Sequence, residues 1–239
     1  MTRPVRILLL DTETNGLPAG RQIPVAQWQH YPAVLQLSWA IYEVDAGSRQ
    51  IGLPVSKRDI GLALDPSVPW NAEAAAIHGI SEVEARRGTP AAEALTELAR
   101  ILTGVDVVVA HNLAFDKAVL RAAGYAEADR RGSEAAAALR QLWSSTIQEF
   151  CTMKELRDLV AIPSPYYGAA SGRFKAPKLN ELYAWLYGHT YDVSGAVMHT
   201  ARADTHCLAQ CLSMLLRRGI VSVRGRCLVT TATAATTHR

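Results

Sequence analysis

Cysteine is scarce in this 239-residue sequence, and no two cysteines form a Cys-x-x-Cys pair. His206 lies beside Cys207 and near Cys211, but a further ligand at the usual spacing of a zinc site is missing. We therefore expect reduced, mostly buried thiols rather than a zinc site. The four cysteines are Cys151, Cys207, Cys211 and Cys227.

The sequence also lacks long apolar runs and a strong excess of either charge. No stretch approaches the roughly eighteen apolar residues that a membrane helix needs. The apolar run before Asp11 is shorter than the apolar region of a signal peptide, which needs at least about seven residues. We therefore expect a cytoplasmic protein with no membrane partner. The formal net charge of +3 permits a nucleic-acid partner without arguing for one.

Short apolar segments are abundant instead, because 49% of the residues are hydrophobic. Strand-like segments come first, and helical and strand-like segments alternate after them, which predicts a mixed α/β sheet flanked by helices. The expected strands cover 5–13, 33–44, 50–64 and 105–110, and the expected helices cover 71–80, 81–88, 89–102, 112–124, 133–145, 178–188 and 201–219.

Caps and low-complexity segments set the expected boundaries. The helix at 112–124 should begin with Asn112 as its cap and end at Gly124. We expect one domain over residues 1–218 and a partly mobile C-terminal extension over 219–239, whose last residues are low in complexity.

Two acids end the first expected strand, in the segment LLLDTETNGL. Residues two apart on a strand point to the same face, so Asp11 and Glu13 should project together from an apolar platform. Two anions placed that close repel each other, and burial strengthens the repulsion. A hard divalent cation such as Mg²⁺ or Mn²⁺ would resolve the conflict. The alternative is a solvated strand end with two ordinary acids.

Two further acids lie near the starts of expected helices. Asp116 follows the buried strand at 105–110, and Asp204 lies near the start of the last helix. Either acid alone could be there because an acid is favoured near a helix N-terminus. His199 precedes Asp204 by five residues, which on one helix would turn the two side chains about 140° apart. The two can share a site only if His199 lies on the loop before the helix.

Together these residues form three motifs in a specific order: DTETNGL at 11–17, HNLAFD at 111–116 and HTARAD at 199–204. The chain resembles the DEDD exonuclease superfamily in its histidine branch (DEDDh), over roughly residues 5–217. Thr200 occupies the position of the tyrosine in the sister branch, which excludes that branch. The histidine branch includes the proofreading (epsilon) subunit of bacterial replicative polymerases. The segment 18–39 is longer than in that subunit and looks more like stand-alone or phage-encoded relatives.

The resemblance implies a ribonuclease H-like fold and a 3′–5′ exonuclease that uses two divalent cations, Mg²⁺ or Mn²⁺. By analogy, Asp11 would bridge both ions, Glu13 and Asp204 would complete one site, and Asp116 would support the other. His199 would be the general base, because the pKa range of histidine suits proton transfer near neutral pH. Expected contacts to the substrate come from Thr12, Thr14, Leu17, His78, Asn112 and Phe115.

Several alternatives remain open at this level. The substrate could be single-stranded DNA, which the resemblance to proofreading relatives favours, or short RNA. The partner is a nucleic-acid 3′ end, and association with a polymerase is also possible. The chain could instead be a catalytically silent nucleic-acid- or polymerase-binding module, or a plain α/β domain whose acids never meet.

Overall fold

The computed structural model describes residues 3–132, 134–143, 147–166, 172–191 and 200–231. A five-stranded mixed sheet with the strand order β3-β2-β1-β4-β5 forms its centre. The first three strands of the sequence pair antiparallel, and β4 and β5 run parallel to β1. The strands are β1 (Val5–Thr14), β2 (Val34–Val44), β3 (Ser56–Gly61), β4 (Val107–Ala110) and β5 (Gln148–Cys151). This is the mixed α/β sheet that the sequence predicts.

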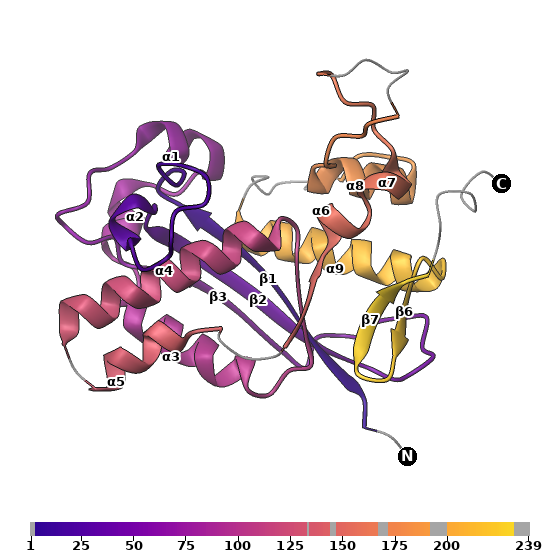
Figure 1. The fold of residues 1–239 in the computed structure, drawn as a ribbon, viewed down its shortest axis with the longest axis horizontal. Helices are drawn as coiled ribbons and strands as arrows, with labels where there is room; N and C mark the ends of the chain where they lie inside the picture. Colours follow the sequence, from indigo (N-terminus) through magenta and orange to yellow (C-terminus); the bar gives the residue numbers. More distant parts are fainter. Residues whose placement is uncertain (1–2, 133, 144–146, 167–171, 192–199, 232–239) are drawn as a thin grey trace.

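Helices cover both faces of the sheet (Figure 1). The longest are α3 (Ala91–Leu102), α4 (Leu113–Arg131), α8 (Leu179–Tyr187) and α9 (Ala201–Arg217). Short ones are η1 (Trp28–His30), α1 (Ala72–His78), α2 (Glu82–Arg86), α5 (Glu134–Ala137), η2 (Ala138–Gln141), α6 (Thr152–Glu155) and α7 (Arg157–Val160). No helix among the described residues is long and apolar enough to cross a membrane.

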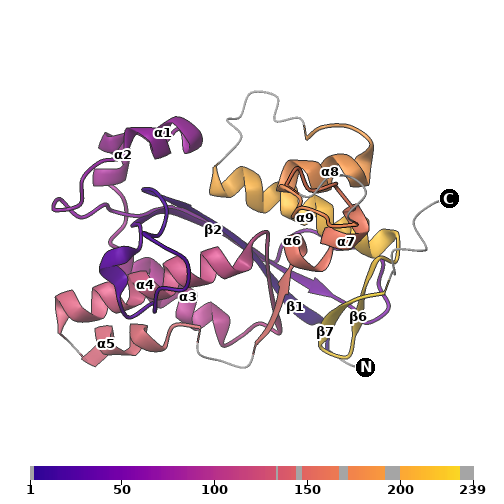
Figure 2. The ribbon, with the colours of Figure 1, turned by 45° about the horizontal axis from the view of Figure 1, so that its top comes forward.

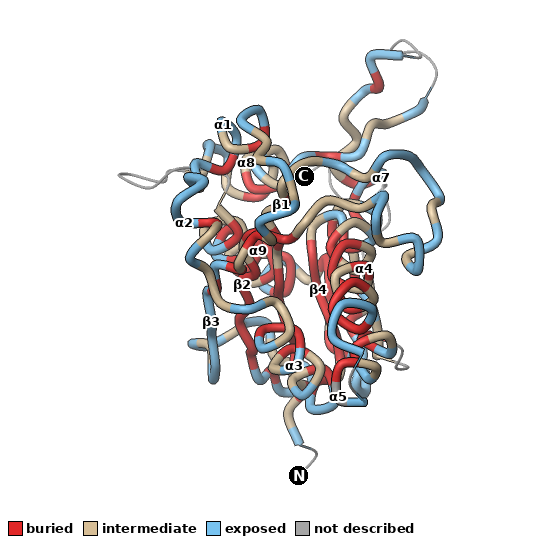
Figure 3. Tube along the Cα trace, turned by 90° about the vertical axis from the view of Figure 1, so that its left-hand side faces the viewer, coloured by how far each residue is buried: buried red, intermediate tan, exposed pale blue. Residues whose placement is uncertain are grey.

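Alternation along β1 divides the interior into two cores, one on each face of the sheet. Ile7 and Leu9 pack in the cluster that includes α8 and α9, and Leu8 and Leu10 pack in the cluster that includes α3 and α4. Figure 2 shows α4 and α9 on opposite sides of the sheet, and Figure 3 shows the buried residues gathered along the strands between them. By the same alternation, Asp11 and Glu13 belong to the face that α9 covers.

β1 extends beyond the strand that runs parallel to it. Its pairing with β4 ends at Leu9 opposite Val109, whereas its pairing with β2 continues to Thr14. After Ala110 the chain turns away from the sheet and begins α4 at Leu113. The end of β1 therefore lies open on one side to the start of α4.

Helix α4 does not end where the sequence analysis expects. It continues past Gly124 to Arg131 and is closed by Gly132, which has a left-handed backbone with φ of 61°. Gly124 is needed for packing instead, because a Cβ there would lie 2.5 Å from the carbonyl oxygen of Leu139 in η2. The helix expected over 133–145 is correspondingly broken into α5 and η2.

The sequence analysis also missed β5 and the C-terminal hairpin of β6 (Val221–Arg224) and β7 (Cys227–Thr230). Val221, Val223 and Leu228 are buried in the same core as α9, so this part of the expected extension is packed. Gln148 holds the hairpin with two bonds to the backbone of Leu228, of 2.6 and 2.7 Å. Residues 232–239, for which mobility was expected, lie outside the described residues.

Gly124→Ala tests the close approach of α4 and η2. At an open position in a helix, this change would stabilise the protein by roughly 1 kcal/mol. Here the added methyl must displace the Leu139 backbone, so we expect a loss of about 1–3 kcal/mol in the free energy of unfolding, measured with urea. The control is Gly61→Ala at the end of β3, where nothing lies within 4 Å of the added Cβ. A more stable Gly124→Ala protein would contradict the packing role.

Candidate metal centre

Three of the predicted acids come together where the end of β1 meets the start of α9. Carboxylate oxygens of Asp11, Glu13 and Asp204 all lie within 4.8 Å of one another. Asp11 and Glu13 extend the α9-facing side of β1, and Asp204 lies in the first turn of α9. A spacing of this size lets one cation bind oxygens from all three residues, and hard oxygen ligands suit Mg²⁺ or Mn²⁺.

Helix α9 begins at this point because Thr200 caps it. The Thr200 side-chain oxygen accepts a hydrogen bond from the backbone N–H of Ala203, at 3.2 Å, and the Thr200 carbonyl accepts one from the N–H of Asp204, at 3.0 Å. A threonine cap of this kind is worth about 1 kcal/mol to a helix. The cap fixes the turn that carries Asp204.

Asp116 approaches from the other face of the sheet. It lies in the first turn of α4, is only 3% exposed, and accepts a hydrogen bond of 2.8 Å from the Thr12 hydroxyl. Thr12 stands between Asp11 and Glu13 on β1 and points to the opposite face from them. Asp116 does not belong to the group of three acids that can share one ion. Burial is the largest cause of the raised pKa of Asp11, and the charge of Asp116 is the largest contribution from a neighbouring residue.

Burial and the neighbouring carboxylates dominate the electrostatics of Asp11 and Glu13. Burial raises the pKa of Asp11 well above its usual value, and the charges of Asp116, Asp204 and Glu13 raise it further. Burial, together with the charges of Asp204 and Asp116, raises the pKa of Glu13 to about 8. Burial raises the pKa of Asp116 to about 7, although the hydrogen bond from Thr12 works against this shift. A divalent cation would favour the ionised forms and remove the conflict.

His199 lies outside the described residues, so its role as a general base stays a prediction. The described chain resumes at Thr200, the cap of α9. The requirement that the last helix begins after His199 is met, since α9 starts at Ala201.

The residues expected to contact substrate have varied surroundings. The Thr12 hydroxyl donates a hydrogen bond to the Asp116 carboxylate, and the Thr14 hydroxyl donates one of 2.7 Å to the carbonyl of Gly16. Leu17 is 80% exposed, as a residue that meets a ligand from solution can be. Phe115 is half-buried and packs against the core on the α4 side.

Asn112 and His78 lie at the ends of helices. Asn112 has a left-handed backbone with φ of 77°, and its exposed side chain makes no capping bond to α4, contrary to the expectation of a side-chain cap. His78 ends α1 and is 2% exposed, and its Nδ1 accepts a hydrogen bond from the N–H of Ile80 at 3.1 Å. Its Nε2 has no hydrogen-bond partner among the described residues. Burial lowers the pKa of His78, which favours the neutral ring.

A groove of about 840 Å³ begins directly after the acids of β1. Asn15, Gly16 and Leu17 line its near end, η1 and α4 form one side, and the start of α1 lies on the other. Asn15 ties the near end of the groove to the side at the start of α1, because its side chain bonds to the carbonyl of Pro69 and to the N–H of Asn71. The long segment after residue 17 contributes Ala19 and residues 28–32 to the wall of this groove.

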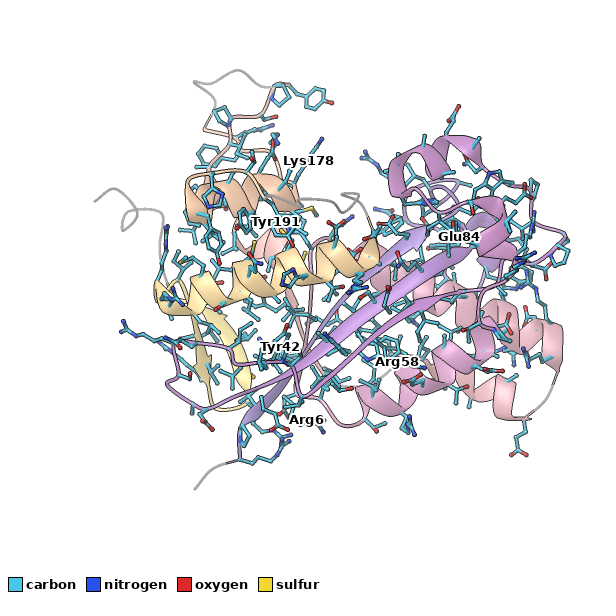
Figure 4. The ribbon with its side chains drawn as sticks, turned by 180° about the vertical axis from the view of Figure 1, so that it is seen from behind. Arg6, Tyr42, Arg58, Glu84, Lys178 and Tyr191 are labelled. Carbon is cyan, nitrogen blue, oxygen red and sulfur yellow. The ribbon has the colours of Figure 1, made fainter. Side chains whose placement is uncertain are left out.

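His111, the first residue of the second motif, and Lys178 lie just before the starts of α4 and α8. His111 joins the loops around the end of β4, because its ring nitrogens lie 2.9 Å from the Thr152 hydroxyl and from the Pro177 carbonyl. Lys178 follows Pro177 and extends into solvent at the start of α8 (Figure 4). Lys175, in contrast, is paired with Glu181.

The raised carboxyl pKa values predict how stability depends on pH. Because the pKa values of Glu13 and Asp116 are raised to about 8 and about 7, each of these two carboxyls holds a proton in the folded protein over a pH range in which it is ionised in the unfolded chain. In EDTA, the contribution of these two carboxyls to the melting temperature should therefore fall as pH rises from about 4.5 to 8. Glu13→Gln should flatten this fall, whereas Glu43→Gln, at an exposed position on β2, should keep it. An equally steep fall in Glu13→Gln would contradict the electrostatic account.

No protein-family model and no curated protein sequence matches the chain. Among solved structures, E. coli exonuclease I in complex with a 5cy-dA13 oligonucleotide is similar, with a TM-score of 0.59 and 15% identity over 90% of this chain and 42% of that chain. A 3′-exonuclease that recognises the 3′ end of a histone mRNA stem-loop has a TM-score of 0.57 and 10% identity over 97% of this chain and 72% of that chain. The chain thus spans about two fifths of the length of E. coli exonuclease I. It has the ribonuclease H-like α/β fold of these exonucleases.

Proposed function

We propose that this chain is a 3′–5′ exonuclease of the DEDD superfamily, in its histidine branch, and that it releases 5′-mononucleotides from single-stranded nucleic acid. The observation that carries the proposal is the meeting of Asp11, Glu13 and Asp204 within 4.8 Å, on a fold shared with exonucleases. A plain α/β domain has no need to gather two acids of an apolar strand end with an acid of a helix, where the charge of Asp204 raises the pKa of both Asp11 and Glu13.

The donor set fits divalent cations. It contains only carboxylates, it is partly buried, and burial together with the neighbouring negative charges raises the pKa values of Asp11 and Glu13. We assign Asp11, Glu13 and Asp204 to one Mg²⁺ or Mn²⁺ ion, with Asp11 and Asp116 supporting a second. Two such ions stabilise both the attacking and the leaving oxygen of an in-line displacement at phosphorus. Thr12 keeps Asp116 oriented for this role through its hydrogen bond.

His199 supplies proton transfer in this proposal. It precedes the cap of α9 by one residue and Asp204 by five. As a general base, His199 would take a proton from the water that attacks the 3′-terminal phosphorus. The bond from this phosphorus to the 3′ oxygen of the preceding nucleotide then breaks, and that oxygen leaves.

We place the end of the strand in the groove that starts at Asn15, two residues after Glu13. Its near end is lined by Asn15, Gly16 and the exposed Leu17, so the terminal nucleotide would meet Leu17 there. Phe115, next to Asp116 in the first turn of α4, is the proposed stacking partner of that nucleotide. Thr14, His78 and Asn112 complete the proposed contacts. DNA is favoured over RNA on resemblance, and the similar structures include complexes of both kinds. Association with a polymerase stays a prediction from the resemblance.

Cleavage of labelled oligonucleotides tests the activity. With Mn²⁺ or Mg²⁺, a 5′-labelled single-stranded DNA should shorten stepwise from its 3′ end, EDTA should stop the reaction, and a circular strand should resist. Asp11→Asn should abolish cleavage without lowering the melting temperature in EDTA, because it relieves repulsion. Full activity in EDTA, or cutting of the circle, would refute the proposal. A parallel RNA oligonucleotide decides the preferred substrate.

The contrast between His199→Ala and Asp204→Asn tests the two assigned roles. General-base help is typically worth 10²- to 10⁴-fold in rate, so His199→Ala should lower kcat by about that factor. Its Mn²⁺ affinity, measured by calorimetry, should stay near that of the wild type. Asp204→Asn should lose both affinity and turnover. If His199→Ala loses the ion as severely as Asp204→Asn, the histidine is a ligand and not the base.

A further inference from the structure

Gln36 lies on β2 directly opposite Glu13, and Ser38 lies opposite Asp11. Side chains two residues apart on a strand point to the same face. Ala40 continues this series into the core beneath α9. Gln36 therefore stands beside the acids of β1, on the face that α9 covers.

The side-chain amide of Gln36 has a partner at each end. Its Oε1 accepts a hydrogen bond of 3.0 Å from the backbone N–H of Ala201, and its Nε2 donates one of 2.8 Å to Asp59 on β3. The partners fix the orientation of the amide, because a backbone N–H only donates and a carboxylate only accepts. Ala201 is the first residue of α9, so Gln36 satisfies one of the N–H groups that a helix leaves unpaired at its start.

A second hydrogen bond joins the next turn of α9 to the same strand. The Thr205 hydroxyl donates to the carbonyl oxygen of Ser38, at 3.4 Å. Asp204 lies between Ala201 and Thr205, so both bonds hold the turn that carries it. Repulsion from Asp11 and Glu13 acts on Asp204 in the opposite direction and favours movement of this turn away from the sheet.

We propose that Gln36 is a positioning residue of the metal centre, which holds the start of α9 so that Asp204 stays within ligand distance of Asp11 and Glu13. This inference rests on the proposed metal centre and names what sets its geometry. Gln36 is not itself a ligand in this account. Removing a group that orients a ligand typically lowers metal affinity or activity by about 10- to 100-fold.

Gln36→Met tests the proposal, because methionine keeps the length of the side chain and removes both hydrogen bonds. The matched control is Gln148→Met. Gln148 also holds a C-terminal element by a two-ended amide contact, to Leu228, but it pairs with Val107 at the opposite end of the sheet from the acids. Asp59→Asn keeps an acceptor for the Gln36 amide and serves as the conservative variant.

The measurements are Mn²⁺ affinity by calorimetry and the free energy of unfolding in urea with EDTA. We expect Gln36→Met to lose about 10- to 100-fold in Mn²⁺ affinity. Gln148→Met should lose stability without losing affinity, and Asp59→Asn should bind within a few-fold of the wild type. Gln36→Asn, whose amide is too short to reach Ala201, is the second variant and should also bind weakly.

Two results would overturn the positioning role. One is wild-type affinity in both Gln36 variants, and the other is an equal loss of affinity in Gln148→Met, which would reduce the effect to general stability. Failure of the wild-type protein itself to bind Mn²⁺ would overturn the proposed function and this inference together. Equal Mn²⁺ affinity in the wild type and in both Gln36 variants would overturn the inference alone.

Discussion

Repulsion between carboxylates at the end of one apolar strand is the constraint on which the other features depend. Asp11 and Glu13 continue a strand whose preceding residues are fully buried, so the acids cannot move apart without disturbing the core. Asp204 and Asp116 are brought to the same place by separate helices. Burial, together with the neighbouring carboxylates, raises the pKa values of Asp11, Glu13 and Asp116, so keeping these groups ionised without a cation costs free energy. Packing of the two cores, one on each face of the sheet, offsets this unfavourable free energy.

The alternation of β1 explains how one short segment serves two helices. Odd-numbered residues face α9 and bring Asp11 and Glu13 to Asp204, whereas Thr12 faces the other way and bonds to Asp116. A shift of one residue in the pairing with β2 would reverse every one of these directions. The pairing with β2 over ten residue pairs, and the burial of Ile7 and Leu9 beneath α9, hold the register.

The parts of the fold that a local pattern determines were predictable from sequence. The buried strands, the mixed sheet and the shared face of Asp11 and Glu13 follow from apolar runs and from a period of two. The end of α4 was not predictable, because the role of Gly124 depends on contact with Leu139, fifteen positions further along the chain. The hairpin of β6 and β7 was missed because its strands are short and its anchor, Gln148, is distant in sequence. The same limit applies to Gln36, whose partners lie on β3 and α9.

Asp106, just before β4, binds both ends of the described chain. Its carboxylate accepts hydrogen bonds from the Arg3 side chain, from the backbone N–H of Arg6 and from Arg226 in the terminal hairpin. Burial would raise the pKa of Asp106, but these bonds and the arginine charges outweigh burial and lower it. Both ends are thus fastened at the edge of the sheet where β1 and β4 begin, and the acids lie where β1 finishes (Figure 1). A fluorescent label or a surface tether attached near residue 3 or near the β6–β7 turn would therefore lie at the opposite end of the sheet from the carboxylates.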